Sequence, residues 1–127
     1  MSIARISTLA VVLTAAALVA APATFAKDGD VRVRGVCTQS STAKLKLGDE
    51  SGRIEVEFEV DQNRVSVPWK LTLQRNGAVV ARTSALTRAP SGSFTVRRLV
   101  GNGPGADRVV VVATSPTGEH CTARASL

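Results

Sequence analysis

The chain contains one histidine, His120, two cysteines, Cys37 and Cys121, and no tyrosine. A structural zinc site needs about four His, Cys or acidic ligands, and His120 has no second histidine with which to share a metal ion. A Cys–His nucleophile needs a free thiolate beside the imidazole, whereas consecutive residues of a strand point to opposite faces. We therefore predict no catalytic residue, no metal and no cofactor, interpret His120 as an exposed strand residue, and do not expect an enzyme.

Aromatic residues are also scarce, with three phenylalanines and one tryptophan in the whole chain. Proteins that bind single-stranded nucleic acid stack successive bases on exposed aromatic side chains, and this chain has too few to form such a platform. The glycine-rich residues 101–107 do not continue into the Gly-Lys-Ser/Thr of a phosphate-binding loop, and neither they nor residues 28–30 match a calcium loop. We expect no nucleic acid partner, and interpret these segments as an inter-strand loop and a terminal segment.

The first 26 residues have the pattern of a secretory signal peptide. Arg5 precedes an apolar run over residues 9–21, and small residues lie at the positions that signal peptidase inspects before a cut after Ala26. We predict export, cleavage after Ala26, a single mature domain of residues 27–127 and no stable membrane insertion after cleavage. The alternative is an uncleaved leader that anchors the protein in a membrane.

Two cysteines in an exported chain predict one disulfide, Cys37–Cys121. The bond would close most of the mature chain into one loop. The chain-entropy model gives such a loop a stabilisation of about 4.5 kcal/mol.

Alternation of apolar and polar residues recurs through the mature chain, whereas no segment has a convincing helical period. The pattern predicts about eight strands, and clusters of Gly, Pro, Asn and Ser separate them. Short strands at this spacing are typical of a β-sandwich or a β-barrel. The expected strands cover residues 31–37, 43–47, 54–60, 67–74, 79–86, 93–100, 108–114 and 120–125.

Charge and apolar patterns together predict strand registers. We expect Leu45 opposite Val56 and Phe58 opposite Leu71, so that apolar partners share one face. The charge pairs that follow on the other face are Lys46–Glu55, Lys44–Glu57 and Lys70–Glu59. We interpret the three glutamates as a solvated ladder, and not as catalytic carboxylates.

Two turns have a recognisable composition. A three-residue loop over residues 75–77, with Gly77 left-handed, would pair Leu73 with Val79 and keep one face apolar. A similar loop over residues 116–118 would pair Thr114 with His120 and Ala113 with Cys121, turning the histidine outward and the cysteine inward.

The formal net charge at pH 7 is +6, and several arginines have no acidic neighbour in the expected registers. If they gather on one face, they form an anion-binding surface for an anionic cell-wall polymer or an acidic protein. The alternatives are a merely soluble basic surface, a small-ligand carrier with a cleft between sheets and, third, an enzyme of unrecognised type. We expect a monomer. The candidate surface residues are Arg32, Arg34, Arg82, Arg97 and Arg98, with Arg88 and Arg108 also unmatched.

The stretch from Val109 to Ala113, its following turn and Cys121-Thr122-Ala123 together resemble the final hairpin of an immunoglobulin-like or fibronectin-like sandwich. The order Cys37, Trp69, Cys121 is similar to the immunoglobulin pattern, although Trp69 lies further from Cys37 than is usual and no tyrosine corner is possible. The segments GRIEVEFEVDQN, WKLTLQRNG and PSGSFTVRR resemble a group of small exported actinobacterial proteins of unknown function. The resemblance implies an all-β, two-sheet antiparallel immunoglobulin-like sandwich.

Overall fold

Residues 29–127 are described by a computed structural model, and they form nine β-strands and no helix. The predicted signal peptide, residues 1–26, lies outside the described residues. Within the described part, no helix is long and apolar enough to cross a membrane. The segments with alternating apolar and polar residues form β-strands, as the sequence pattern predicts.

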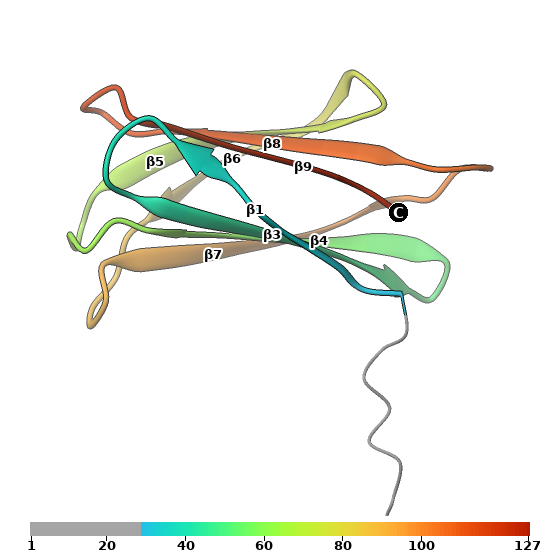
Figure 1. The fold of residues 1–127 in the computed structure, drawn as a ribbon, viewed down its shortest axis with the longest axis horizontal. Coiled ribbons are helices and arrows are strands. Elements are labelled where there is room, and N and C mark those ends of the chain that lie inside the picture. Colours follow the sequence, from blue (N-terminus) through green and yellow to red (C-terminus); the bar gives the residue numbers. More distant parts are fainter. Residues whose placement is uncertain (1–28) are drawn as a thin grey trace, which may run out of the picture.

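The strands are arranged in two antiparallel sheets that face each other (Figure 1). Sheet A contains β1 (Val31–Arg34), β3 (Thr42–Glu50), β4 (Arg53–Asp61) and β7 (Ser93–Gly101), in that spatial order. Sheet B contains β2 (Val36–Cys37), β9 (His120–Ser126), β8 (Arg108–Thr114), β5 (Pro68–Arg75) and β6 (Ala78–Leu86), in that order. The predicted two-sheet antiparallel sandwich is confirmed.

Gly35 divides the first expected strand into β1 and β2, which belong to different sheets. Its amide donates to the carbonyl oxygen of Ala43 at 2.9 Å. A Cβ at this position would lie 2.9 Å from the Cβ of Ala43 and 3.0 Å from the carbonyl oxygen of Thr122. The chain can pass so closely between the two sheets only because residue 35 has no side chain.

The core lies between the sheets and is built from the inward residues of each strand. On β4, Ile54, Val56, Phe58 and Val60 are at most 1% exposed. Burying each such side chain contributes about 1.5–3 kcal/mol. Trp69 is fully buried, and its indole Nε1 donates a hydrogen bond to Gln62 Oε1 at 3.0 Å.

The disulfide Cys37–Cys121 is confirmed. The two cysteines are direct partners in the ladder between β2 and β9, so the bond lies within sheet B. The immunoglobulin disulfide instead joins the two sheets. The connectivity also differs from that pattern, because β3 and β4 form a hairpin within sheet A.

The predicted register of β3 and β4 is wrong by two residues. Leu45 lies opposite Phe58, and not opposite Val56. The strands extend through Gly48 to a two-residue turn at Ser51 and Gly52, which have φ of 52° and 78° as a type I′ turn requires. A shift of two keeps every side chain on its predicted face, so the apolar face is still buried. The observed charge partners are Lys46–Glu57 and Lys44–Glu59.

The predicted pairing of Phe58 with Leu71 is also wrong, because β4 and β5 lie in different sheets. Residues 62–67 cross from sheet A to sheet B, whereas the prediction assumed a hairpin. Phe58 lies opposite Val96 of β7 as well as its β3 partner. Lys70 has Ser84 and Thr114 as its neighbours, and not Glu59.

The loop between β5 and β6 has two residues and not the predicted three. Asn76 and Gly77 have φ of 50° and 84°, again as in a type I′ turn. A register shift after Leu73 then inserts an extra residue into β6 and brings Ala81 opposite Leu73. In a regular ladder, a two-residue turn here would place Arg82 on the inward face. The bulge shifts the register by one residue, so Arg82 is exposed.

The hairpin between β8 and β9 has the predicted register. Ala113 lies opposite Cys121 and Thr114 opposite His120, and Gly118 has a φ of 85°. Cys121 is fully buried. His120 is exposed, as predicted.

Candidate anion-binding surface

Four cationic side chains lie together on the outer face of sheet A. In the ladder between β1 and β3, Arg32 is opposite Lys46 and Arg34 is opposite Lys44. The inward neighbours of these residues, Leu45 among them, belong to the core, so strand alternation turns all four cations towards solvent. We call Arg32, Arg34, Lys44 and Lys46 the basic face.

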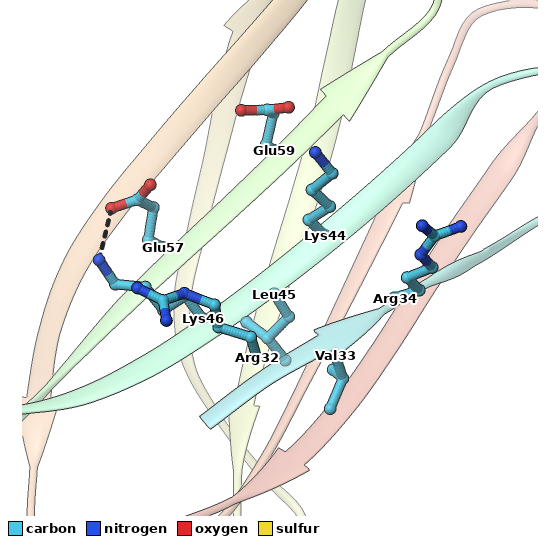
Figure 2. Close-up of a pocket in the computed structure, with 8 residues that line it drawn as sticks. All are labelled: Arg32, Val33, Arg34, Lys44, Leu45, Lys46, Glu57 and Glu59. Atoms are coloured by element: carbon cyan, nitrogen blue, oxygen red, sulfur yellow. Dashed lines mark ion pairs between the residues drawn. The ribbon is translucent and has the colours of Figure 1, made fainter. Parts of the chain in front are cut away.

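Two glutamates of β4 border the basic face. Figure 2 shows Arg34, Lys44 and Glu59 in one row across the sheet and Arg32, Lys46 and Glu57 in the next. Each row therefore has two cations and one carboxylate. The positive charge is in excess on this face.

The ion pairs leave part of this excess without a partner. Glu57 Oε2 lies 3.7 Å from Lys46 Nζ and accepts a hydrogen bond from Arg97 Nε at 3.0 Å, so one carboxylate serves two cations. Arg32 Nη2 lies 3.8 Å from a carboxylate oxygen of Asp30. Within residues 29–127, Arg34 and Lys44 form no ion pair with another side chain. These two cations are therefore available to a ligand.

The side chains of the basic face and its two glutamates surround a depression of about 360 Å³ (Figure 2). It opens on the solvent side of sheet A. Its walls are the charged side chains and the aliphatic stems that carry them. Val33 and Leu45 also line it, and most of its lining surface is apolar. A ligand here would lie on the surface, with the ammonium and guanidinium groups of the basic face around it.

The pairing of like charges is not explained by the needs of the fold. Cations placed directly opposite each other on neighbouring strands destabilise the pair, and both outward pairs of β1 and β3 are of this kind. Acids at residues 32 and 34 would give each lysine a second favourable cross-strand partner, in addition to its glutamate on β4. The arrangement instead concentrates charge in the way that an anion-binding surface requires.

The structure places two of the five predicted arginines in the basic face and a third beside it. Arg32 and Arg34 are part of it, and Arg97 of β7 adjoins it through Glu57. Arg82 is exposed on β6, in sheet B. Arg98 donates to Thr83 Oγ1 at 2.9 Å and to the carbonyl oxygen of Arg97 at 2.8 Å, so it links β7 to β6 across the open side of the sandwich.

The two lysines of the basic face were not among the residues predicted for the site, because Lys44 and Lys46 were expected to be neutralised by glutamates. The stretches VRVR and AKLKL both carry cations at alternate positions, which was the available signal. These cations form one face only because β1 pairs with β3. Alternation in the sequence does not specify which strands are neighbours.

Glu119, which was also not singled out from the sequence, is buried beside His120 and has a structural role. One carboxylate oxygen accepts a hydrogen bond from the Ser41 amide at 3.1 Å, and the other accepts from the Ser41 hydroxyl. The Glu119 amide donates to Ser115 Oγ at 3.2 Å. The carboxylate thus fastens the connection between β2 and β3 to the turn between β8 and β9.

Asp107, at the end of the glycine-rich loop, is likewise buried and satisfied. It accepts hydrogen bonds from Arg75 Nε at 2.9 Å, Asn76 Nδ2 at 3.0 Å and the Gly103 amide at 3.1 Å. Burial acts to raise the pKa of Asp107, but these hydrogen bonds and the Arg75 charge outweigh it and hold the pKa below its usual range. The carboxylate stabilises the loop against the β5–β6 turn.

Within residues 29–127, a void next to Phe58 and Leu71, between the sheets, has a volume of about 10 Å³. That is room for about one water molecule. Side chains of both sheets therefore fill the interior at this point, and the larger depressions lined by Arg34 lie on the outside.

The chain matches no protein-family model, no curated protein and no solved structure. Its class is therefore defined by its own geometry. It is a two-sheet antiparallel β-sandwich with one intra-sheet disulfide and a cationic outer face.

Proposed function

We propose that this protein is a non-catalytic exported binding module that holds an anionic cell-wall polymer on its basic face. The observation that carries the proposal is the pair of cation–cation partners, Arg32–Lys46 and Arg34–Lys44, at the mouth of one depression. Exposed cations next to one another attract a polyanion through their summed field, and the attraction falls as salt screens it.

The proposal of export rests on two features. The leader has the order of charge, apolar run and small residues that signal peptidase recognises. The disulfide Cys37–Cys121 is of a kind that forms and persists in oxidising compartments. A binding module for a wall polymer would act in that environment.

The geometry favours this proposal over a small-ligand carrier. A carrier pocket has a volume of about 300–1,000 Å³ and buries most of its ligand. The void between the sheets has a volume of about 10 Å³. The depression on the basic face has a suitable volume, about 360 Å³, but it is open and bordered by charged side chains, which suits a polymer that remains partly in solvent.

Retention on purified anionic wall polymer, measured at increasing NaCl concentrations, tests the proposal. The variant Lys44→Gln/Lys46→Gln removes two cations of the basic face. The control Lys70→Gln/Arg82→Gln removes two exposed cations of sheet B and has the same net charge. We expect the first variant to elute at lower salt and its slope of log affinity against log salt to decrease by about one per cation lost. Equal behaviour of the two variants would overturn the proposal.

A further inference from the structure

The positive surface does not end at β1. Arg34 also lines a second depression of about 320 Å³, together with Val36 and Arg124. Arg124 in turn lines a third depression of about 280 Å³, together with Arg108. Because neighbouring depressions share Arg34 and then Arg124, the three form one path from sheet A to sheet B.

The change of sheet at Gly35 produces this path. Arg34 is the last residue of β1 in sheet A, and Val36 begins β2 in sheet B, opposite Thr122. Arg124 is the next outward residue of β9 after Thr122, so it lies near the point where β1 leaves for the other sheet. The corner of the sandwich therefore has an arginine on each side.

The path continues from Arg124 to Arg108. Arg124 lies opposite Val110 on β8, and Arg108 lies opposite Ser126, so the two arginines are diagonal neighbours on the outer face of sheet B. Such neighbours have Cα atoms about 7–8 Å apart, within the reach of long side chains. Among the described residues that line the second and third depressions, none is acidic.

We infer that the ligand is a single linear phosphate polymer, which crosses the basic face, bends round the corner at Arg34 and continues over sheet B. The six cations on this path, which we call the cationic groove, are Lys44, Lys46, Arg32, Arg34, Arg124 and Arg108. The inference rests on the proposed function and specifies its ligand class.

The shape of the groove selects a thin and flexible ligand. Two inter-strand spacings of about 4.8 Å and one inter-sheet spacing of about 10 Å give a path of about 20 Å. That path bends from one face of the sandwich to the other. A folded acidic protein would contact one of these faces, whereas a polymer chain can follow both.

The side chains of the groove fit phosphate. Four of its six cations are arginines, whose guanidinium groups donate two parallel hydrogen bonds to a phosphate, as they also do to a carboxylate. The aromatic side chains of the described residues, Trp69, Phe58 and Phe94, are at most 6% exposed. Sugar rings and bases therefore find no aromatic stacking surface among the described residues, and recognition rests on the charged groups of the polymer backbone.

The test uses long-chain inorganic polyphosphate, tripolyphosphate and poly-L-glutamate as probes of the mature protein. The groove variant Arg108→Gln/Arg124→Gln changes only exposed side chains of sheet B. It is compared with Lys44→Gln/Lys46→Gln and with the control Lys70→Gln/Arg82→Gln. Equal thermal unfolding midpoints establish that all variants are folded.

We expect long-chain polyphosphate to bind at least about tenfold more weakly to each groove variant than to the control. Tripolyphosphate, which is too short for the path, is expected to bind more weakly than the long chain and to be insensitive to Arg108→Gln/Arg124→Gln. Poly-L-glutamate is expected to bind more weakly than long-chain polyphosphate.

Four results would overturn the inference, the last of them together with the proposed function. Unchanged long-chain binding by Arg108→Gln/Arg124→Gln, with loss in Lys44→Gln/Lys46→Gln, would refute the extended groove and leave the proposed function intact. Tripolyphosphate binding as tight as that of the long chain would refute the groove in the same way. Poly-L-glutamate binding as tight as polyphosphate would refute the choice of phosphate. Unchanged binding by both variants would refute the proposed function itself.

Discussion

Gly35 is the residue whose substitution most directly perturbs the passage between the two sheets. In Gly35→Ala, the new methyl group would lie 2.9 Å from the Cβ of Ala43 and 3.0 Å from the carbonyl oxygen of Thr122. Carbon atoms in favourable contact are about 3.5–4.0 Å apart, so β1 or β9 has to move by several tenths of an ångström. Because the Thr122 oxygen belongs to the backbone, no rotamer change can relieve the contact.

The expected loss follows from the cost of overpacking. Forcing an extra methyl group into a well-packed site costs about 1–3 kcal/mol. Replacing glycine by alanine also restricts the unfolded chain, which stabilises a protein by about 0.4–1 kcal/mol where the conformation is compatible. We expect a net loss of about 1–2 kcal/mol in the free energy of unfolding, which lowers the melting temperature by about 4–16 °C for a domain of this size.

Urea unfolding with the disulfide intact measures this loss. Gly101→Ala is the matched control, because a Cβ there would approach only the flexible Arg75 side chain, at 3.4 Å. The control variant restricts the unfolded chain in the same way, but its new methyl group approaches no backbone atom. If Gly35→Ala proved as stable as Gly101→Ala, the close passage between the sheets would not be as described.

Three further predictions concern stability. Glu119→Ala removes the acceptor of two Ser41 hydrogen bonds and is expected to lower the free energy of unfolding by about 1–3 kcal/mol, measured in urea. We expect a smaller loss in Glu119→Gln. Equal stability of the wild type and Glu119→Ala would contradict this role. The pKa of Asp107 is lowered in the folded protein, so its contribution is complete above the usual value of about 3.9 and disappears as the pH falls through the lower folded pKa. Asp107→Asn should therefore destabilise the protein more at pH 7 than at pH 2, and an equal loss at both would refute the assignment. Replacing Cys37 and Cys121 by serine is expected to cost up to about 4.5 kcal/mol, and an unchanged urea midpoint would contradict the account of the disulfide.

Alternation in the sequence predicts which face a side chain occupies but not which strands are neighbours. Leu45 and Phe58 are both buried, as expected, although their partners were predicted incorrectly. A shift of two residues leaves the faces unchanged, so apolar and charge patterns agree with more than one register. The type I′ turn at Ser51 and Gly52 selects the observed one.

The candidate site was harder to predict, because its residues come from strands that the sequence does not order. Arg34 and Lys44 are neighbours only through the pairing of β1 with β3. Arg124 comes near Arg34 only because Gly35 allows the chain to change sheets. By contrast, the disulfide and the outward position of His120 depend on compartment and on one local turn, and both could be predicted.

The most direct test of the central claim is the salt-dependent affinity of the mature protein for anionic wall polymer, compared between Lys44→Gln/Lys46→Gln and Lys70→Gln/Arg82→Gln. The basic face predicts weaker binding and a shallower salt dependence for the first variant, with the second close to wild type. If both variants lose affinity equally, binding follows net charge alone, and the basic face is not a site.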